Sequence, residues 1–167
     1  MVKIMGGYSS LVLIREALRT GTFAGLAMIP FAAAFRAWDL RINEYGAKTL
    51  ALLIGEVAAP LHYLLTLAQH LLISWLVAAP LLIMLSCISR TRGRILAGLL
   101  YGAGFYVAVN SLALPFAFGD PTPWELGLRT VYPSLVVHLV FGFVVALLAR
   151  PTAVSLPNAG RRESRTP

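Results

Sequence analysis

The residues best suited to chemistry are two histidines and an asparagine that lie inside long apolar segments. His70, Asn110 and His138 each lie about eight or nine residues from the end of a segment on the same predicted side. That distance is about 12 Å along a helix. We therefore expect one polar layer in the protein interior, made of His70, His138, Asn110, Tyr106 and Gln69, with Thr66, Ser74 and Ser111 close by.

Three kinds of chemistry fit such a layer, and the residues leave them open. Polar side chains inside a membrane commonly hydrogen-bond across helices, at about 0.6–2 kcal/mol each. Histidines can instead line a route for protons or small solutes, because imidazole titrates near neutral pH. Two facing imidazoles are also the axial ligands that a b-type haem requires. We expect helix packing and no cofactor, with the conducting route and the haem as alternatives.

The remaining polar residues do not predict an enzyme. The sequence has no nucleophile elbow, P-loop, dinucleotide-binding glycine pattern or zinc-protease motif. Asp120 and Glu125 could form a metal or acid/base site with His62, but ordinary solvated loop charges explain them more simply. The single cysteine, Cys87, excludes an intrachain disulfide and any cysteine-based metal centre within one chain. We predict a protein without catalytic or metal-ligating residues.

Composition places these residues in a membrane protein. The 167 residues are 58% hydrophobic and 13% charged, whereas a soluble domain carries about 25% charged residues. The net charge of +7 comes from short basic clusters between and beyond the apolar segments. Such clusters follow from membrane topology, so we do not expect nucleic-acid binding.

Four apolar segments are long enough to cross a bilayer, which needs about 20 residues. The predicted spans cover residues 21–38, 61–89, 95–118 and 130–149 of a single transmembrane domain over 1–150. A short helix over 8–19 lies along the membrane surface or extends the first span inward. Cleavage of a signal peptide after Ala34 is an alternative for this region. Residues 151–167 read as a disordered cytoplasmic tail.

Two connections between the spans carry further expectations. Residues 47–59 are apolar but too short to span, so we predict an extra short interfacial helix or a re-entrant segment. Residues 119–129 form a polar loop in which Pro121 and Pro123 should exclude regular structure. Trp124 in that loop reads as an interfacial anchor.

The distribution of basic residues predicts the orientation. With the amino terminus inside, ten basic residues fall in inner segments and four fall in outer ones. The outer four are Arg36, Arg41, Lys48 and Arg129, and the turn between spans two and three alone carries Arg90, Arg92 and Arg94. By the positive-inside rule, both termini are cytoplasmic.

Small residues spaced four apart predict how the spans pack. Residues at this spacing share one helix face, and small side chains let membrane helices approach closely. The glycines concerned are Gly21, Gly25, Gly98, Gly102 and Gly142.

The part of the chain from the second predicted span to the fourth resembles the YagU-like family of small bacterial inner-membrane proteins of uncharacterised function. His70 in one span, a following span with Gly98, Gly102 and Gly104, and a late His138-x-x-x-Gly142 carry the resemblance over residues 60–149. The amino-terminal pattern of that family is not evident here. The resemblance implies a bacterial inner membrane and no assigned activity.

Together these features predict an all-α integral membrane four-helix bundle. The function that fits best is a structural or accessory membrane subunit that contacts the lipid bilayer and belongs to a homo-oligomer or a larger complex. A transporter or proton-conducting protein is the alternative, and a haem-binding redox subunit is the second one.

Overall fold

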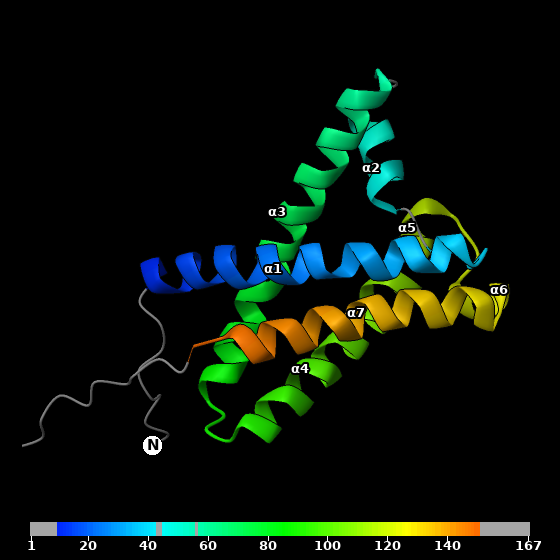
Figure 1. Cartoon of the computed structure of the whole chain (residues 1–167). Helices are drawn as coiled ribbons and strands as arrows, with labels where there is room; N and C mark the ends of the chain where they lie inside the picture. Colours follow the sequence, from blue (N-terminus) through cyan, green and yellow to red (C-terminus); the bar gives the residue numbers. More distant parts are fainter. Residues whose placement is uncertain (1–9, 43–44, 56, 151–167) are drawn as a thin grey trace, which may run out of the picture.

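The computed structural model describes residues 10–42, 45–55 and 57–150. In these ranges every regular element is a helix (Figure 1). In chain order they are α1 (Ser10–Ala37), α2 (Tyr45–Ile54), α3 (Ala59–Ser86), α4 (Thr91–Phe105), the π-helix η1 (Tyr106–Ala113), α5 (Leu114–Phe118), α6 (Pro123–Leu126) and α7 (Leu128–Leu148). The all-α prediction is confirmed.

Four helical stretches are long and apolar enough to cross a membrane. They are α1, α3, the continuous run of α4, η1 and α5 over Thr91–Phe118, and α7. Large apolar side chains point outward on all of them, among them Phe23, Leu76, Leu100, Phe116 and Leu147. Such a surface is unsuited to water and suited to acyl chains. The chain is therefore built as a membrane protein.

The observed boundaries differ from the predicted ones mainly at the amino-terminal end. The first span begins at Ser10 instead of Gly21, so the predicted short helix and the span form one helix as far as the structure describes it. Pro30 and Pro80 lie inside α1 and α3 without ending either helix. The predicted tail, residues 151–167, lies outside the described residues.

The two connections contain short helices. The extra helix predicted near residues 47–59 is α2, and it ends before Gly55, whose φ of 71° suits only glycine comfortably. The prediction that Pro121 and Pro123 exclude regular structure is wrong, because Pro123 begins the single turn α6. Proline is favoured in the first turn of a helix, where its missing N–H has no partner to lose.

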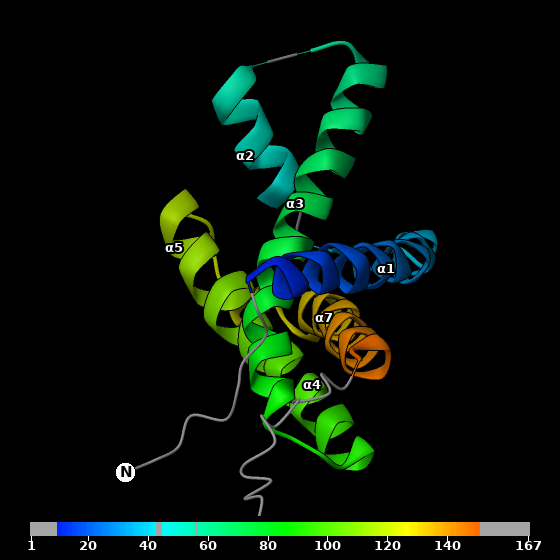
Figure 2. The ribbon, with the colours of Figure 1, turned by 90° about the vertical axis from the view of Figure 1, so that its left-hand side faces the viewer.

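The long helices cross at different angles. Figures 1 and 2 show α1 and α7 side by side, α4 against the opposite side of α7, and α3 crossing α1 steeply near its middle. The packed pairs are α1 with α3, α1 with α7, and α4 with α7. The apolar core lies where α1, α7 and the second half of α3 meet, and includes Ala24, Ala78, Leu81, Leu82 and Val145. The first half of α3 leaves this core and projects together with α2 (Figure 2).

Candidate functional site

Close glycine contacts fix the register between α4 and α7. A Cβ atom at Gly98 would overlap the backbone of Gly142, and one at Gly102 would overlap the backbone of His138. A Cβ at Gly142 would in turn overlap the backbone of Gly98. The two antiparallel helices are therefore in backbone contact, which only glycine allows.

Gly21 and Gly25 make the corresponding contact between α1 and α3. A Cβ at Gly21 would lie 2.8 Å from the carbonyl oxygen of Ser74, and one at Gly25 would lie 2.6 Å from Ser74 Oγ. All five glycines singled out in the sequence thus lie at these two helix contacts.

Polar residues continue the α4–α7 contact toward the predicted outer end. Extending the glycine register by one turn sets Tyr106 level with Ser134, and Asn110 in η1 and Thr130 in α7 lie further along their helices. All four side chains are buried, as is Ser111 beside Asn110. We call these five residues, Tyr106, Asn110, Ser111, Thr130 and Ser134, the polar seam.

Three hydroxyls of the polar seam have no hydrogen-bond partner among the described residues. They are Tyr106 Oη, Ser111 Oγ and Ser134 Oγ. A buried hydroxyl without a partner costs about 1–3 kcal/mol, and acyl chains cannot supply one. The seam therefore has the chemistry to hold water or another small polar molecule.

The wide turn of η1 positions half of the seam. Its π-type hydrogen bonds place Tyr106, Asn110 and Ser111 on the buried side of the helix. Pro115 lies two residues after the end of η1 and has no N–H to donate to the carbonyls one turn earlier. Single π turns inside α-helices often occur at functional sites. Sequence reasoning missed η1, although Pro115 was its available signal.

The two histidines are held by backbone carbonyls at different helix contacts. His138 Nδ1 donates to the carbonyl of Ser134 at 2.6 Å in the same helix. Its ring lies 5.8 Å from the ring of Phe105 and 5.7 Å from that of Tyr106, measured between centroids. His70 Nε2 donates to the carbonyl of Gly25 at 3.0 Å, across the α1–α3 crossing. The N–H positions follow because a carbonyl oxygen only accepts.

The predicted layer is thus divided in the structure. His138 and Tyr106 lie together, with Asn110 on the same side of η1 as Tyr106. His70 lies at the neighbouring α1–α3 contact, close enough for an electrostatic interaction with His138. The side chain of Gln69 lies instead beside Gly46 of α2.

This arrangement does not fit a bis-histidine haem. Iron ligation by His70 through Nε2 would break its hydrogen bond to Gly25. Both rings would also have to turn from separate helix contacts toward one axis. The haem alternative stays a prediction that a visible absorption spectrum tests.

A second polar group lies at the opposite end of the molecule and was missed. Glu16 is buried in α1 and pairs with Arg19 at 2.6 Å and Arg150 at 3.9 Å. Arg19 also donates to the carbonyl of Leu148 at 2.7 Å. Cations at a helix carboxyl terminus donate hydrogen bonds to its free carbonyls and interact favourably with the negative end of the helix dipole. Only the spacing of Glu16 and Arg19, three apart, was visible in the sequence.

The carboxylates at the predicted outer end form contacts that do not include His62. Asp120 pairs with Lys48 at 2.5 Å. Glu125 accepts hydrogen bonds from the backbone N–H and the hydroxyl of Thr122, and these bonds hold the pKa of Glu125 below its ordinary value. Within the described residues, no three histidine, cysteine or acidic side chains are grouped to hold a metal ion.

No protein-family model matches the chain, and neither the curated proteins nor the solved structures gave a match. The YagU-like resemblance stays a prediction.

Proposed function

We propose that this protein is a non-enzymatic accessory subunit of a bacterial inner membrane, with both termini cytoplasmic. It associates laterally with another membrane protein through α2 and residues 59–69 of α3, which we call the α2–α3 arm. The packing of α3 carries this proposal. Its buried residues are Ser74, Ala78, Leu81, Leu82 and Leu85, all in the second half of the helix.

The arm combines a short apolar helix with the first part of a candidate span, and few of its described residues are buried. Tyr45 and Leu50 are the buried residues of α2, while Leu53 and Leu64 are largely exposed. Membrane helices gain stability from close packing with other helices. The described part of the arm has few buried residues, and a neighbouring transmembrane helix would supply the missing contacts.

Photo-crosslinking in native membranes tests the association. Leu64 in the arm and Leu100 in α4 are matched controls, with exposed fractions of 62% and 64%. A photoreactive phenylalanine at position 64 should give a protein adduct, and the same residue at position 100 should give lipid adducts only. Mass spectrometry then identifies the partner as another protein or a second copy. Lipid adducts alone at both positions would refute lateral association through the arm.

The polar seam favours a second candidate function, conduction of protons or small polar solutes. Its three hydroxyls without protein partners and the nearby His138 would serve as successive hydrogen-bonding groups. Imidazole beside such groups can pass protons because one ring nitrogen can accept a proton while the other donates one.

Replacing the histidines separates the two functions. In the accessory subunit, His70→Ala and His138→Ala mainly lower stability or partner binding, because both side chains hold backbone carbonyls. In a conducting protein, the same changes abolish flux while the fold persists. The measurement is proton flux into proteoliposomes with an internal pH dye, next to a thermal unfolding curve of each variant. Phe143→Ala, on an exposed side chain of α7, is the control.

A further inference from the structure

The three unpartnered hydroxyls of the polar seam need a hydrogen-bonding group that the described residues do not supply. Tyr106, Ser111 and Ser134 are completely buried, and none of their hydroxyl oxygens has a partner among those residues. A hydroxyl buried in this way loses its hydrogen bonds to water on folding unless a bound molecule restores them. The seam is therefore a candidate binding site.

Two prolines add backbone acceptors at the same place. Pro115 lies in α5, and Pro133 lies in α7 directly before Ser134. A proline has no N–H, so it cannot donate to the carbonyl four residues earlier in a helix. These carbonyls belong to Ser111 and Arg129. The seam thus combines hydroxyls, which donate and accept, with carbonyls, which only accept.

The chemistry of the seam selects a small uncharged ligand. Its five side chains carry hydroxyl and amide groups and no formal charge. An ion would lose its hydration there without gaining an opposite charge in return. Water both donates and accepts, and buried waters typically make about three hydrogen bonds to groups of this kind. Water therefore fits the seam.

The glycine contact closes the seam toward the predicted inner end. Gly102 lies one turn before Tyr106, and a Cβ atom at Gly102 would overlap the backbone of His138. Gly98 and Gly142 repeat this contact one turn further. A place that cannot accept one added carbon atom cannot accept a water molecule either. Water in the seam therefore cannot continue along the α4–α7 contact.

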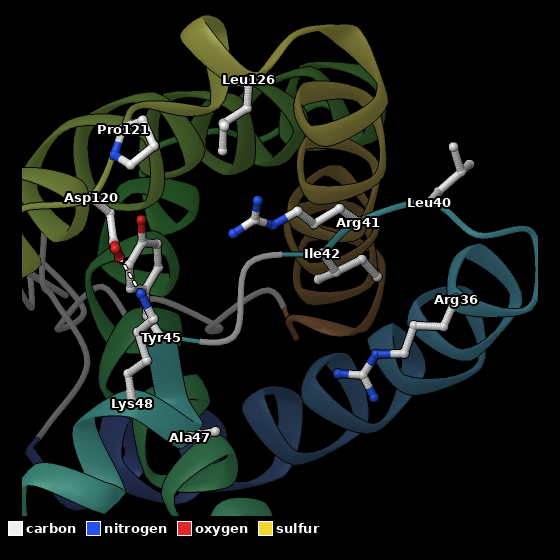
Figure 3. Close-up of a pocket in the computed structure, with 10 residues that line it drawn as sticks. All are labelled: Arg36, Leu40, Arg41, Ile42, Tyr45, Ala47, Lys48, Asp120, Pro121 and Leu126. Atoms are coloured by element: carbon white, nitrogen blue, oxygen red, sulfur yellow. Dashed lines mark hydrogen bonds and ion pairs between the residues drawn. The ribbon is translucent and has the colours of Figure 1, made fainter.

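At the predicted outer end, the seam lies close to a surface pocket. The ring of Trp124 in α6 lies 6.1 Å from that of Tyr106, and Trp124 is itself half exposed. Two residues later, Leu126 lines a pocket of about 410 Å³. Figure 3 shows Lys48 paired with Asp120 in the wall of this pocket, which is therefore partly polar. The single turn of α6 thus borders both the seam and the pocket.

We propose that the polar seam is a closed binding site for water, in which bound water bridges η1 to α7. Tyr106 Oη and Ser134 Oγ are the water-binding groups on the two sides of the contact. Such waters supply the hydrogen bonds that acyl chains cannot. The inference is independent of the accessory role. It concerns the same residues as the conducting candidate but needs no flux, because a closed site binds water without passing it on.

Reversible unfolding in mixed detergent micelles tests the bound water. Tyr106→Phe and Ser134→Ala each delete one water-binding hydroxyl and should each raise the unfolding equilibrium constant about fivefold, since one net hydrogen bond is lost. The double variant should raise it by less than the product of the two effects, because both changes act on the same bound water. The matched control is Tyr101→Phe, whose hydroxyl donates to the carbonyl of Val77 at 2.9 Å. Its effect should multiply fully with that of Ser134→Ala.

A dry seam would give the opposite sign. Deleting a buried hydroxyl that has no partner removes a desolvation penalty. A Tyr106→Phe variant more stable than the parent would therefore overturn the proposal. Full multiplication of the Tyr106→Phe and Ser134→Ala effects would overturn the water shared between η1 and α7.

X-ray radiolysis of the parent protein detects the water without any substitution. Hydroxyl radicals form from bound as well as bulk water and oxidise a neighbouring ring. Tyr106 should be oxidised despite its complete burial, whereas Phe141, buried in the apolar core, should not. Protection of both rings would overturn the water site and the conducting candidate together. Oxidation of Tyr106 without proton flux would support the water site and remove only the conducting candidate.

Discussion

At the scale of single residues, close backbone contacts at glycines hold the helices together. Gly98, Gly102 and Gly142 place backbone against backbone, so one added methyl group must separate α4 from α7. Gly104 lies on the same helix with open space where its Cβ would be. The chain thus contains its own control for the effect of a methyl group.

Gly102→Ala should lower the free energy of unfolding by about 2 kcal/mol, because overpacking a rigid contact typically costs 1–3 kcal/mol. Gly104→Ala should leave it unchanged or raise it by up to about 1 kcal/mol, through the restricted unfolded chain. Reversible unfolding in mixed detergent micelles measures both. A Gly102→Ala variant as stable as Gly104→Ala would contradict the close contact.

At the scale of elements, local capping explains a helix in a segment rich in proline. Thr122 and Glu125 form a reciprocal capping box around the single turn of α6. The pKa of Glu125 is lower in the folded protein than in the unfolded chain. The Glu125 carboxylate therefore stabilises the fold fully above its pKa in the unfolded chain, about 4.3. This stabilisation is lost as the pH falls through the lower pKa of Glu125 in the folded protein.

We expect α6 to open as the pH is lowered from 6 to below 4. Trp124 lies in α6, with its ring 6.1 Å from that of Tyr106, so its fluorescence reports the opening. Glu125→Gln should remove this pH dependence while Trp124 still reports on the site. An unchanged titration curve in Glu125→Gln would assign the transition to another group.

At the scale of the whole molecule, the proposed topology can be tested with the single cysteine. Cys87 is exposed and lies directly after α3, at the end that carries the arginine turn. With both termini cytoplasmic, a membrane-impermeant maleimide should label Cys87 in inside-out vesicles but not in intact spheroplasts. The control is Leu128→Cys in a Cys87→Ser background, 79% exposed at the start of α7, which should give the reverse pattern. Labelling of Cys87 from outside would invert the topology.

The sequence predicted the number and class of the helices because long apolar segments carry that information directly. Counting residues from the span ends also predicts similar depths for His70, Gln69 and Asn110. It could not give the direction in which each faces. Gln69 and His70 are neighbours at one depth, yet one side chain lies beside α2 and the other beside α1.

Contacts between distant segments were the other feature that the sequence could not give. Glu16 is buried although it is charged, and it pairs with Arg19 of α1 and with Arg150 after the end of α7. Likewise, Lys48 and Asp120 lie 72 residues apart and form one pair. Such pairs depend on how separate helices pack against one another, and no periodicity within one helix encodes that packing.

The π-helix η1 has a consequence for how this chain tolerates changes in length. A π turn uses about one residue more than an α turn for the same rotation. Removing one residue from 107–109 can therefore convert the wide turn to an α turn while α5 keeps its rotational phase relative to α4. The same deletion between Gly98 and Gly102 would rotate every later side chain by about 100°. The third span should thus tolerate the deletion of one residue beside the polar seam, but not along its glycine contact with α7.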